Sequence, residues 1–295
     1  MWDGSYPCCV HTDVLRLTAF AADPSGGNPA GVVLDAAALT DSEMQQIAAR
    51  VGYAETAFVT RPPAPELDGS ARVGIRYFSP AAEVPFCGHA TIATAVALAW
   101  RDGVGATVFE TRAGELEVRT SEHDGRVAAA FTSVEPRVEE IPADVLDGLL
   151  RIVGLTRADL HPGYPPRSAF AGNVHPIVVL TDVAALDRVA FDAAELRAYM
   201  DAHGWVATVT LVHPRDSGTY EARNPFPVGT LDEDPATGSA AAALGGYLRE
   251  LRLVDPPARV LVHQGRHVGR PSLLTVDVPP TGGIVVSGTA FRIQD

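Results

Sequence analysis

The 295-residue sequence contains no lysine, since all 23 of its basic residues are arginine. Chemistry that needs a lysine amine is therefore excluded, including a pyridoxal-phosphate Schiff base and the phosphate-binding lysine of a Walker A loop. The 36 acidic residues outnumber the basic ones and give a net charge of −13. A nucleic acid or an anionic membrane surface needs a basic face, so we expect neither as a partner.

Cysteine is also scarce, with only Cys8, Cys9 and Cys87, and no C-x-x-C pair is present. This excludes a disulfide scaffold and favours a reducing, cytoplasmic environment. No run of about 20 uncharged apolar residues exists that could span a membrane. The first residues lack the basic and apolar regions of a signal peptide, and we expect residues 1–13 to be a flexible extension.

The two halves of the chain resemble each other in their helix signals. Thr40 begins a capping-box pattern and an amphipathic stretch that ends at Gly52. The same pattern starts 152 positions later at Asp192 and ends at Gly204. Each glycine is followed by a β-rich run, over 53–60 and 205–213. Such matches at one offset favour a duplicated unit over coincidence.

A second match lies 150 positions apart, where EVPFCGHA (83–90) aligns with EDPATGSA (233–240). Alanine-rich segments follow, 90–100 and 240–251, and we expect both to be helices buried in a curled sheet. The fold class is therefore α+β, with two duplicated domains that each contain several strands, a peripheral helix and an apolar helix against the sheet. We expect the domains over 14–130 and 131–295, and the last strand can return to the first domain.

Positions that differ between duplicated halves are candidates for chemistry, because both halves share what the fold needs. Three equivalent pairs differ: Glu55 and Ala207, Val84 and Asp234, His89 and Ser239. Glu55 is a candidate general acid/base, and a solvated loop glutamate is the alternative. Asp234 can orient His89 or accept a hydrogen bond from a substrate, although an aspartate before proline is also a common turn residue.

The segments Gly88-His89 and Gly238-Ser239 each open an expected helix. Because helix N-termini offer free N–H groups and a positive dipole end, the pair can hold a carboxylate between the domains. The alternative is that Ser239 only caps its helix and His89 only packs. Gly265 is a turn glycine that can border the same cleft.

His263 and His267 have the spacing of a helical metal pair, but they lie in a strand–turn–strand pattern that separates them. We therefore predict no metal site there.

Five motifs resemble the phenazine-biosynthesis PhzF-like family, a relative of diaminopimelate epimerase. They are GGNPAGVV (26–33), YAETAFV (53–59), IRYFSPAAEVPFCGHATIA (75–93), the block 223–248 with EDPATGSA, and HQG…GRPS (263–272). The resemblance implies two pseudo-symmetric α/β domains, each a β-barrel-like sheet around a central helix, with the site between them. It also implies a homodimer and neither metal nor cofactor.

The resemblance also implies roles for individual residues. In the PhzF-type isomerase, the glutamate matching Glu55 moves a proton between ring carbons of a dihydro-hydroxyanthranilate. Residues matching His89, Asp234 and Ser239 hold and polarise this carboxylate-bearing substrate. Further substrate-binding positions lie in the matching motifs, namely Asn28, Gly88, Gly238 and Gly265.

Related epimerases use two thiols on opposite faces of the substrate. Cys87 stands at the first position, but Thr237 occupies the second, and its hydroxyl is too weak an acid to replace a thiol. We therefore expect proton transfer by a single base, with Cys87 as a packed residue. An amino-acid racemase or epimerase and a non-catalytic binding homologue remain as alternatives.

Overall fold

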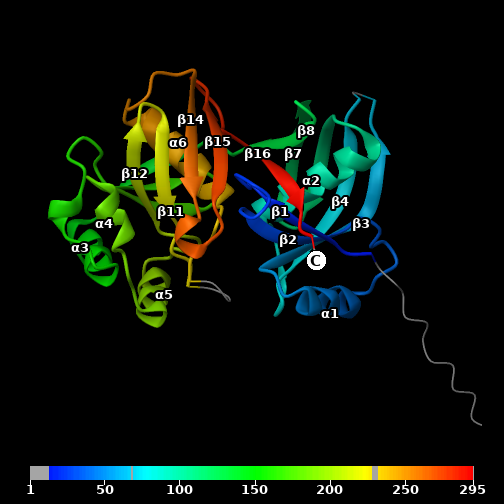
Figure 1. The fold of residues 1–295 in the computed structure, drawn as a ribbon, viewed down its shortest axis with the longest axis horizontal. Coiled ribbons are helices and arrows are strands. Elements are labelled where there is room, and N and C mark those ends of the chain that lie inside the picture. The colour runs from blue at the N-terminus through cyan, green and yellow to red at the C-terminus, as the bar shows by residue number, and fades with distance from the viewer. Residues whose placement is uncertain (1–12, 68, 228–231, 295) are drawn as a thin grey trace, which may run out of the picture.

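The computed structural model describes residues 13–67, 69–227 and 232–294. The predicted extension therefore lies outside the described residues except for Asp13. The chain forms two lobes that lie side by side (Figure 1). In the part of the chain that is described, no helix is long and apolar enough to cross a membrane.

The first lobe is a closed barrel of eight strands around a buried helix. Its strands, in barrel order, are β1 (Leu15–Ala19), β2 (Asn28–Val33), β3 (Glu55–Pro65), β4 (Ala71–Phe78), β6 (Ala106–Thr111), β7 (Gly114–His123), β8 (Arg126–Thr132) and β16 (Val285–Arg292). The barrel closes because β1 pairs with β16 as well as with β2. The short β5 (Glu83–Val84) pairs with β4. Helix α2 (Gly88–Asp102) runs through the barrel, as its uniformly apolar composition predicts.

The second lobe curls a sheet around helix α6 (Gly238–Glu250). From β16 this sheet continues through β15 (Ser272–Val278), β14 (Ala258–Gln264), β13 (Thr219–Arg223), β12 (Thr210–Asp216), β11 (Val174–Val179), β10 (Arg167–Phe170) and β9 (Arg137–Glu140). The predicted barrel-like sheets around central helices are confirmed, but only the first is closed. Among the described strands, β9 is paired on one edge alone, with β10.

Strand β16 belongs to both lobes. Its first residues pair with β15, and its last residues pair with β1, while β8 covers the opposite edge. Gly288 lies where the partner changes, and a Cβ atom there would approach the Phe20 ring to 2.4 Å. The last strand of the chain thus joins the two lobes through its backbone.

The topology confirms the duplication. In the first lobe β2 and β3 are parallel, β3 and β4 are antiparallel, and β6 returns parallel to β4 after α2. Strands β11, β12, β13 and β14 repeat this order around α6. The β-rich run expected over 205–213 differs from the structure, because β12 begins only at Thr210. Just before it, the carbonyl and hydroxyl oxygens of Thr208 lie 3.0 Å from Nδ1 of a buried histidine, His175.

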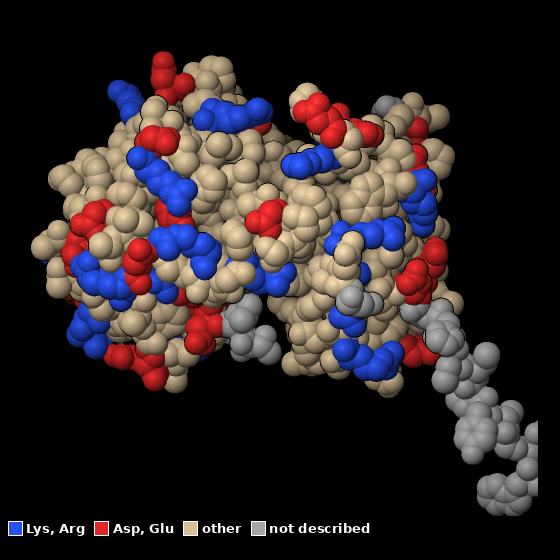
Figure 2. Space-filling view, in the orientation of Figure 1, with Lys and Arg blue, Asp and Glu red and all other residues tan. Residues whose placement is uncertain are grey.

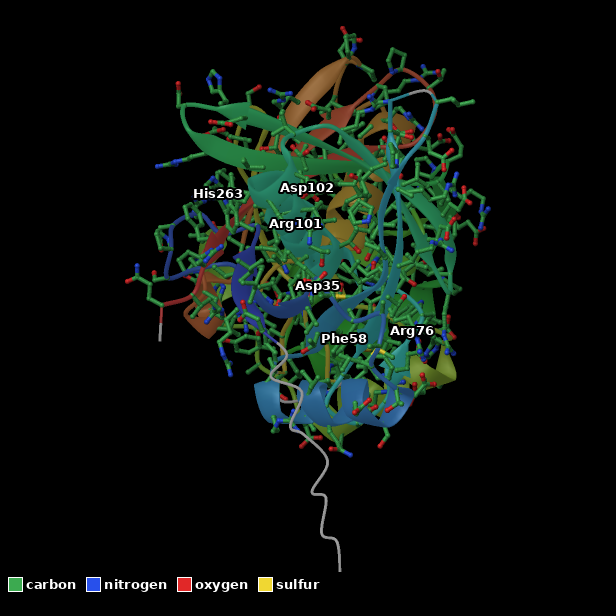
Figure 3. The ribbon with its side chains drawn as sticks, turned by 90° about the vertical axis from the view of Figure 1, so that its right-hand side faces the viewer. Asp35, Phe58, Arg76, Arg101, Asp102 and His263 are labelled. Atoms are coloured by element: carbon green, nitrogen blue, oxygen red, sulfur yellow. The ribbon has the colours of Figure 1, made fainter. Side chains whose placement is uncertain are left out.

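The predicted helix boundaries agree closely with the structure. Helix α1 (Asp41–Val51) begins after Thr40, whose side chain and Glu43 form the capping box, and ends at Gly52 in the left-handed conformation. Figure 3 shows Phe58 and Arg76 next to this helix, and Arg76 donates to Asp41 at 2.6 Å. Besides α6, five short helical segments of the described residues belong to the second lobe: α3 (Ala143–Ile152), η1 (Arg157–Asp159), α4 (Val183–Asp187), α5 (Ala193–Ala202) and η2 (Arg266–Val268). Figure 1 shows α3, α4 and α5 at the outer side of this lobe.

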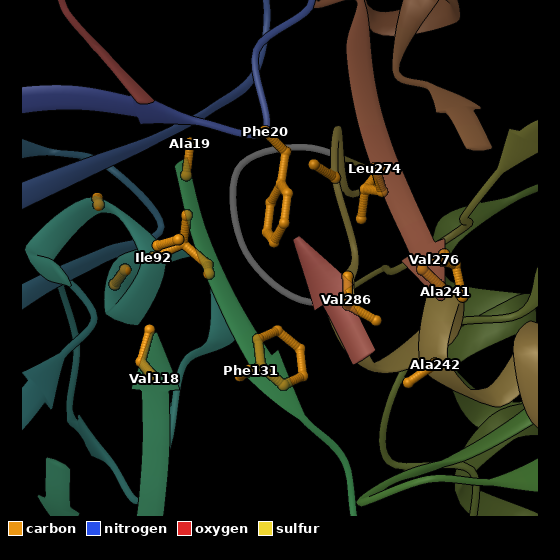
Figure 4. Close-up of a cluster of buried hydrophobic side chains, with 14 of the residues drawn as sticks. Ala19, Phe20, Ile92, Val118, Phe131, Ala241, Ala242, Leu274, Val276 and Val286 are labelled. Atoms are coloured by element: carbon orange, nitrogen blue, oxygen red, sulfur yellow. The ribbon is translucent and has the colours of Figure 1, made fainter. Parts of the chain in front are cut away.

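The lobes share a continuous hydrophobic core. Phe20 and Phe131 lie between the buried face of α2 and the strand that carries Leu274 (Figure 4). A Cβ atom on Gly238 would come within 3.0 Å of the Phe131 ring. Gly238 is therefore needed for packing at the start of α6, whatever else it does.

Charged side chains of both signs are interspersed over the visible face in Figure 2. Many of the arginines are held by carboxylates, as Arg259 is held by Asp277 at 2.6 Å and 3.0 Å. Such pairing leaves mixed charge and no broad basic face in this view.

The turn between β14 and β15 contains two glycines with positive φ in different surroundings. Gly265 has φ 83°, and a Cβ atom would lie 2.3 Å from the Arg270 carbonyl oxygen and 2.6 Å from that of Pro235. Gly269 has φ 69°, with open space around it. Both positions disfavour a side chain through φ, but only Gly265 adds a clash.

We expect Gly269→Ala to lower the free energy of unfolding by about 1 kcal/mol, which is the cost of placing alanine at positive φ. Gly265→Ala adds a steric clash to this cost, so we expect it to lower the thermal midpoint more than Gly269→Ala does. Thermal unfolding followed by circular dichroism measures both. Equal losses would show that the close approach of Gly265 to Pro235 has no energetic weight.

Candidate active site

The candidate site lies at the N-termini of α2 and α6, which approach each other between the lobes. Cys87 and Thr237 occupy the N-cap positions of these helices with similar extended backbones, φ/ψ −145°/113° and −115°/95°. The first N–H groups of a helix have no intrahelical partner, so each start offers donors for an anion. The duplicated sequence thus places two helix starts of similar backbone geometry close to each other.

Glu55 lies at the first residue of β3, where it pairs with Ala30 of the parallel strand β2. Its Oε2 atom is 3.4 Å from the Cys87 sulfur and 3.5 Å from His89 Nε2. The Glu55 side chain is 21% exposed, whereas that of His89 is 8% exposed. The carboxylate is therefore partly exposed to solvent but held by two buried partners.

Cys87 belongs to this cluster as well as to the core. Burial raises the pKa of the Cys87 thiol well above its ordinary value, and the neighbouring Glu55 charge raises it further. The thiol therefore keeps its proton and donates to Glu55. Sequence reasoning assigned Cys87 to packing and missed its contact with the predicted base.

The Glu55, Cys87 and His89 ligand atoms lie within 4.8 Å of one another, which is close enough for a metal ion. Without a metal ion the raised pKa keeps the Cys87 thiol protonated, so a metal that bound there would have to displace this proton. The absence of a metal in the reaction stays a prediction.

Asp234 connects the lobes. Its Oδ1 atom accepts from Asn28 Nδ2 at 2.6 Å, and its Oδ2 atom accepts from the Thr237 hydroxyl at 2.6 Å. Gln264 donates to the Asp234 carbonyl at 2.6 Å and to Thr237 Oγ1 at 3.0 Å. Asn28 is thus placed as a contact between β2 and the start of α6. Gln264 lies in the HQG motif, but the sequence did not single out its side chain as part of the site.

The Asp234 carboxyl group does not bond to His89 in this arrangement, because Asn28 and Thr237 take its oxygens. Burial raises the pKa of Asp234 to about 6, with the nearby His89 lowering it and Glu55 raising it. The two carboxylates and the imidazole therefore lie close enough to influence one another's charge.

The loop that carries Asp234 is anchored by a buried ion pair. Glu233 accepts from two guanidinium nitrogens of Arg223, and Arg223 also donates to the Leu186 and Val189 carbonyls. Both charged residues are about 9% exposed. Removing one partner of such a pair costs several kcal/mol, so Arg223 holds the loop in place.

Ser239, in the first turn of α6, contacts a residue that the sequence analysis did not select. Its Oγ atom is 3.0 Å from Nε2 of His175, which is fully buried on β11. A signal existed in the duplication: the first-half segment equivalent to GNVHPIVVL, GNPAGVVL (27–34), has no histidine.

The predicted residues form two neighbouring groups of contacts. Glu55 contacts His89 next to Gly88, and Asn28 contacts Asp234 near Gly238 and Ser239. Gly265 packs against Pro235 of the same loop. A Cβ atom on Gly88 would meet only the Phe86 ring, at 3.9 Å, so Gly88 leaves space at the α2 terminus.

The raised pKa of Asp234 makes stability depend on pH with a definite sign. The unfolded chain releases this proton near pH 4, but the folded protein keeps it until about pH 6. Asp234 therefore contributes stability below pH 4 that is lost as pH rises through 6. Since burial lowers the pKa of His175 to about 4, His175 gives the opposite slope, and only a comparison of variants isolates Asp234.

We expect the unfolding free energy of the wild type, relative to Asp234→Asn, to fall by about 2–3 kcal/mol between pH 4 and pH 7. Urea unfolding followed by tryptophan fluorescence at several pH values measures this difference. The exposed Asp35→Asn variant is the matched control for the loss of one carboxylate. A constant offset for Asp234→Asn would contradict the raised pKa.

Comparison with known proteins identifies the family. The model of the phenazine biosynthesis-like protein family matches residues 17–293. An uncharacterized isomerase, YfhB, of Bacillus subtilis is 32% identical over 94% of this chain and 95% of its own length. The trans-2,3-dihydro-3-hydroxyanthranilate isomerase of Pseudomonas aeruginosa is also 32% identical, over 93% of this chain and 98% of its own.

Solved structures agree. A PhzF-family phenazine biosynthesis protein of Bacillus anthracis superposes with a TM-score of 0.81 at 25% identity, over 96% of this chain and 97% of that one. A hydroxyproline epimerase of Agrobacterium vitis shares the fold, with a TM-score of 0.61 at 14% identity over 95% of this chain and 90% of that one. The chain therefore belongs to the phenazine biosynthesis-like PhzF family and is an isomerase of the diaminopimelate epimerase-like fold.

Proposed function

We propose that this isomerase moves a proton within a small carboxylate-bearing molecule, with Glu55 as its single acid/base and no cofactor. The observation that carries the proposal is the position of Glu55. Its carboxylate is partly exposed at the meeting point of the two helix starts, and it contacts a protonated thiol and an imidazole. A carboxylate with these neighbours can take a proton from carbon and return it.

Two features support a single base. The N-cap of α6 is Thr237, at the position equivalent to Cys87, and its hydroxyl is already bonded to Asp234. The two helix starts therefore do not offer a pair of thiols. We propose that Glu55 removes a proton from one carbon, that the electron pair delocalises over the adjacent unsaturated bonds, and that Glu55 returns the proton to another carbon.

The anion-binding ends of α2 and α6 support a carboxylate on the substrate. The Pseudomonas aeruginosa relative acts, by its name, on trans-2,3-dihydro-3-hydroxyanthranilate, a ring acid with an amine and a hydroxyl. We propose a substrate of this class, with His89 and Asp234 facing its polar groups. We further propose that the protein works as a cytoplasmic homodimer.

An amino-acid epimerase is the second candidate, because Cys87, at the N-cap of α2, keeps one of the two positions that hold thiols in related epimerases. The two reactions differ in outcome. Inversion at a stereocentre with uptake of solvent deuterium would favour the epimerase, whereas movement of hydrogen between carbons without inversion favours the isomerase.

We expect Glu55→Gln to lower kcat on trans-2,3-dihydro-3-hydroxyanthranilate by about 10²–10⁴-fold, because it removes the proton carrier but keeps size and polarity. Ultraviolet absorbance follows the change in conjugation. The exposed Glu66→Gln variant is the control with wild-type turnover, and circular dichroism checks that both variants fold. Turnover by Glu55→Gln at the wild-type rate would remove Glu55 from the mechanism.

A further inference from the structure

The ring of His175 is held in one tautomer by its surroundings. Its Nδ1 atom lies 3.0 Å from the backbone carbonyl oxygen of Thr208, which can only accept a hydrogen bond. The Thr208 hydroxyl oxygen is also 3.0 Å away, and that hydroxyl donates its own proton to Asn224 Oδ1. Two acceptors therefore face Nδ1, so Nδ1 carries a proton.

The opposite ring nitrogen is consequently a bare acceptor. Burial keeps the His175 ring neutral, since it lowers the pKa to about 4. A neutral imidazole with its proton on Nδ1 has only a lone pair at Nε2. Ser239 Oγ is 3.0 Å from this lone pair, so the Ser239 hydroxyl donates its proton to His175.

We propose that Ser239 presents an oxygen lone pair, rather than a proton, to the cleft. Its oxygen then recognises a hydrogen-bond donor on the substrate, an amine or hydroxyl next to the carboxylate. This specificity rests on the proposed function. Ser239 lies in the first turn of α6, so its backbone N–H is among those free for the carboxylate, while its side chain takes the adjacent donor. Ser239 is only half-buried, so a ligand can reach it.

The opposite orientation is disfavoured. If the hydroxyl turned to donate to a substrate carboxylate, His175 Nε2 would be left buried without a donor. The ring cannot adapt by moving its proton, because Nδ1 would then face the Thr208 carbonyl with a lone pair.

Ser239 and His175 also have the spacing of a nucleophile and its base. A general base must become an imidazolium, however, and the groups at Nδ1 are a carbonyl and a hydroxyl rather than a carboxylate. His175 is therefore a positioning residue that orients the Ser239 hydroxyl, and not a base.

The first test measures the tautomer and needs no ligand. Nitrogen-15 correlation spectra of the protein with labelled histidine rings report which nitrogen carries the proton, and His175→Gln identifies the relevant signals. We expect a neutral, Nδ1-protonated ring that does not titrate between pH 5.5 and 8. This pH range lies about 1 unit or more above the His175 pKa of about 4. An Nε2-protonated or titrating ring would overturn the proposal.

The second test compares two acids that differ by one amine, 3-hydroxyanthranilate and 3-hydroxybenzoate, by isothermal titration calorimetry. We expect Ser239→Ala to weaken the binding of 3-hydroxyanthranilate by about 5–10-fold and that of 3-hydroxybenzoate by less than about twofold. Ser239→Thr keeps the hydroxyl, so we expect it to keep the wild-type difference in affinity between the two acids. Equal weakening of both acids would show that the hydroxyl binds the carboxylate. Covalent labelling of Ser239 by a fluorophosphonate would show a nucleophile instead, and would also overturn the proposal.

The two arms separate this inference from the proposed function. If Glu55→Gln turns over at the wild-type rate but His175 is protonated on Nδ1, the proposed function fails and the inferred orientation of Ser239 stands. If neither acid binds the wild type, the substrate class is wrong, and the tautomer measurement alone decides how the hydroxyl points.

Discussion

The site depends on the contact between lobes that Asn28 and Asp234 make. These residues are 206 positions apart, and their 2.6 Å hydrogen bond joins a barrel strand of one lobe to the helix start of the other. The contact is supported by β16, which pairs with strands of both lobes, and by a core that runs between them. Because the helix starts face each other only in this arrangement, the lobes must stay joined for their functional groups to act together.

Duplication provides two similar helix starts, and their differences separate the roles. Cys87 and Thr237 have the same backbone position, yet one donates to Glu55 and the other to Asp234. One half therefore holds a carboxylate that is partly exposed. The other half holds a carboxylate whose oxygens are occupied and whose pKa is raised to about 6, mainly by burial. These unequal environments are the basis on which we propose different roles for the two neighbouring carboxylates.

Neutral hydrogen bonds also set direction in this site. A carbonyl oxygen behind His175 decides where its proton lies, and the ring then decides where the Ser239 proton points. No charge is needed, because each buried polar group must find a partner of the opposite kind. The Thr208 carbonyl thus sets the hydrogen-bonding character of the Ser239 hydroxyl through His175, although only Ser239 would touch the ligand.

The sequence by itself determined the local elements, the duplication and the candidate positions. The capping box at Thr40, the stop at Gly52 and the apolar helix over 90–100 rest on local backbone and burial preferences, and the structure contains all three. Comparison of the halves selected Glu55, His89, Asp234 and Ser239. Only the tertiary structure decided that Cys87 bonds to Glu55, that Asn28 rather than His89 holds Asp234, and that His175 orients Ser239. These contacts join residues distant in sequence, and hydrogen-bond direction depends on which groups the fold brings together in space.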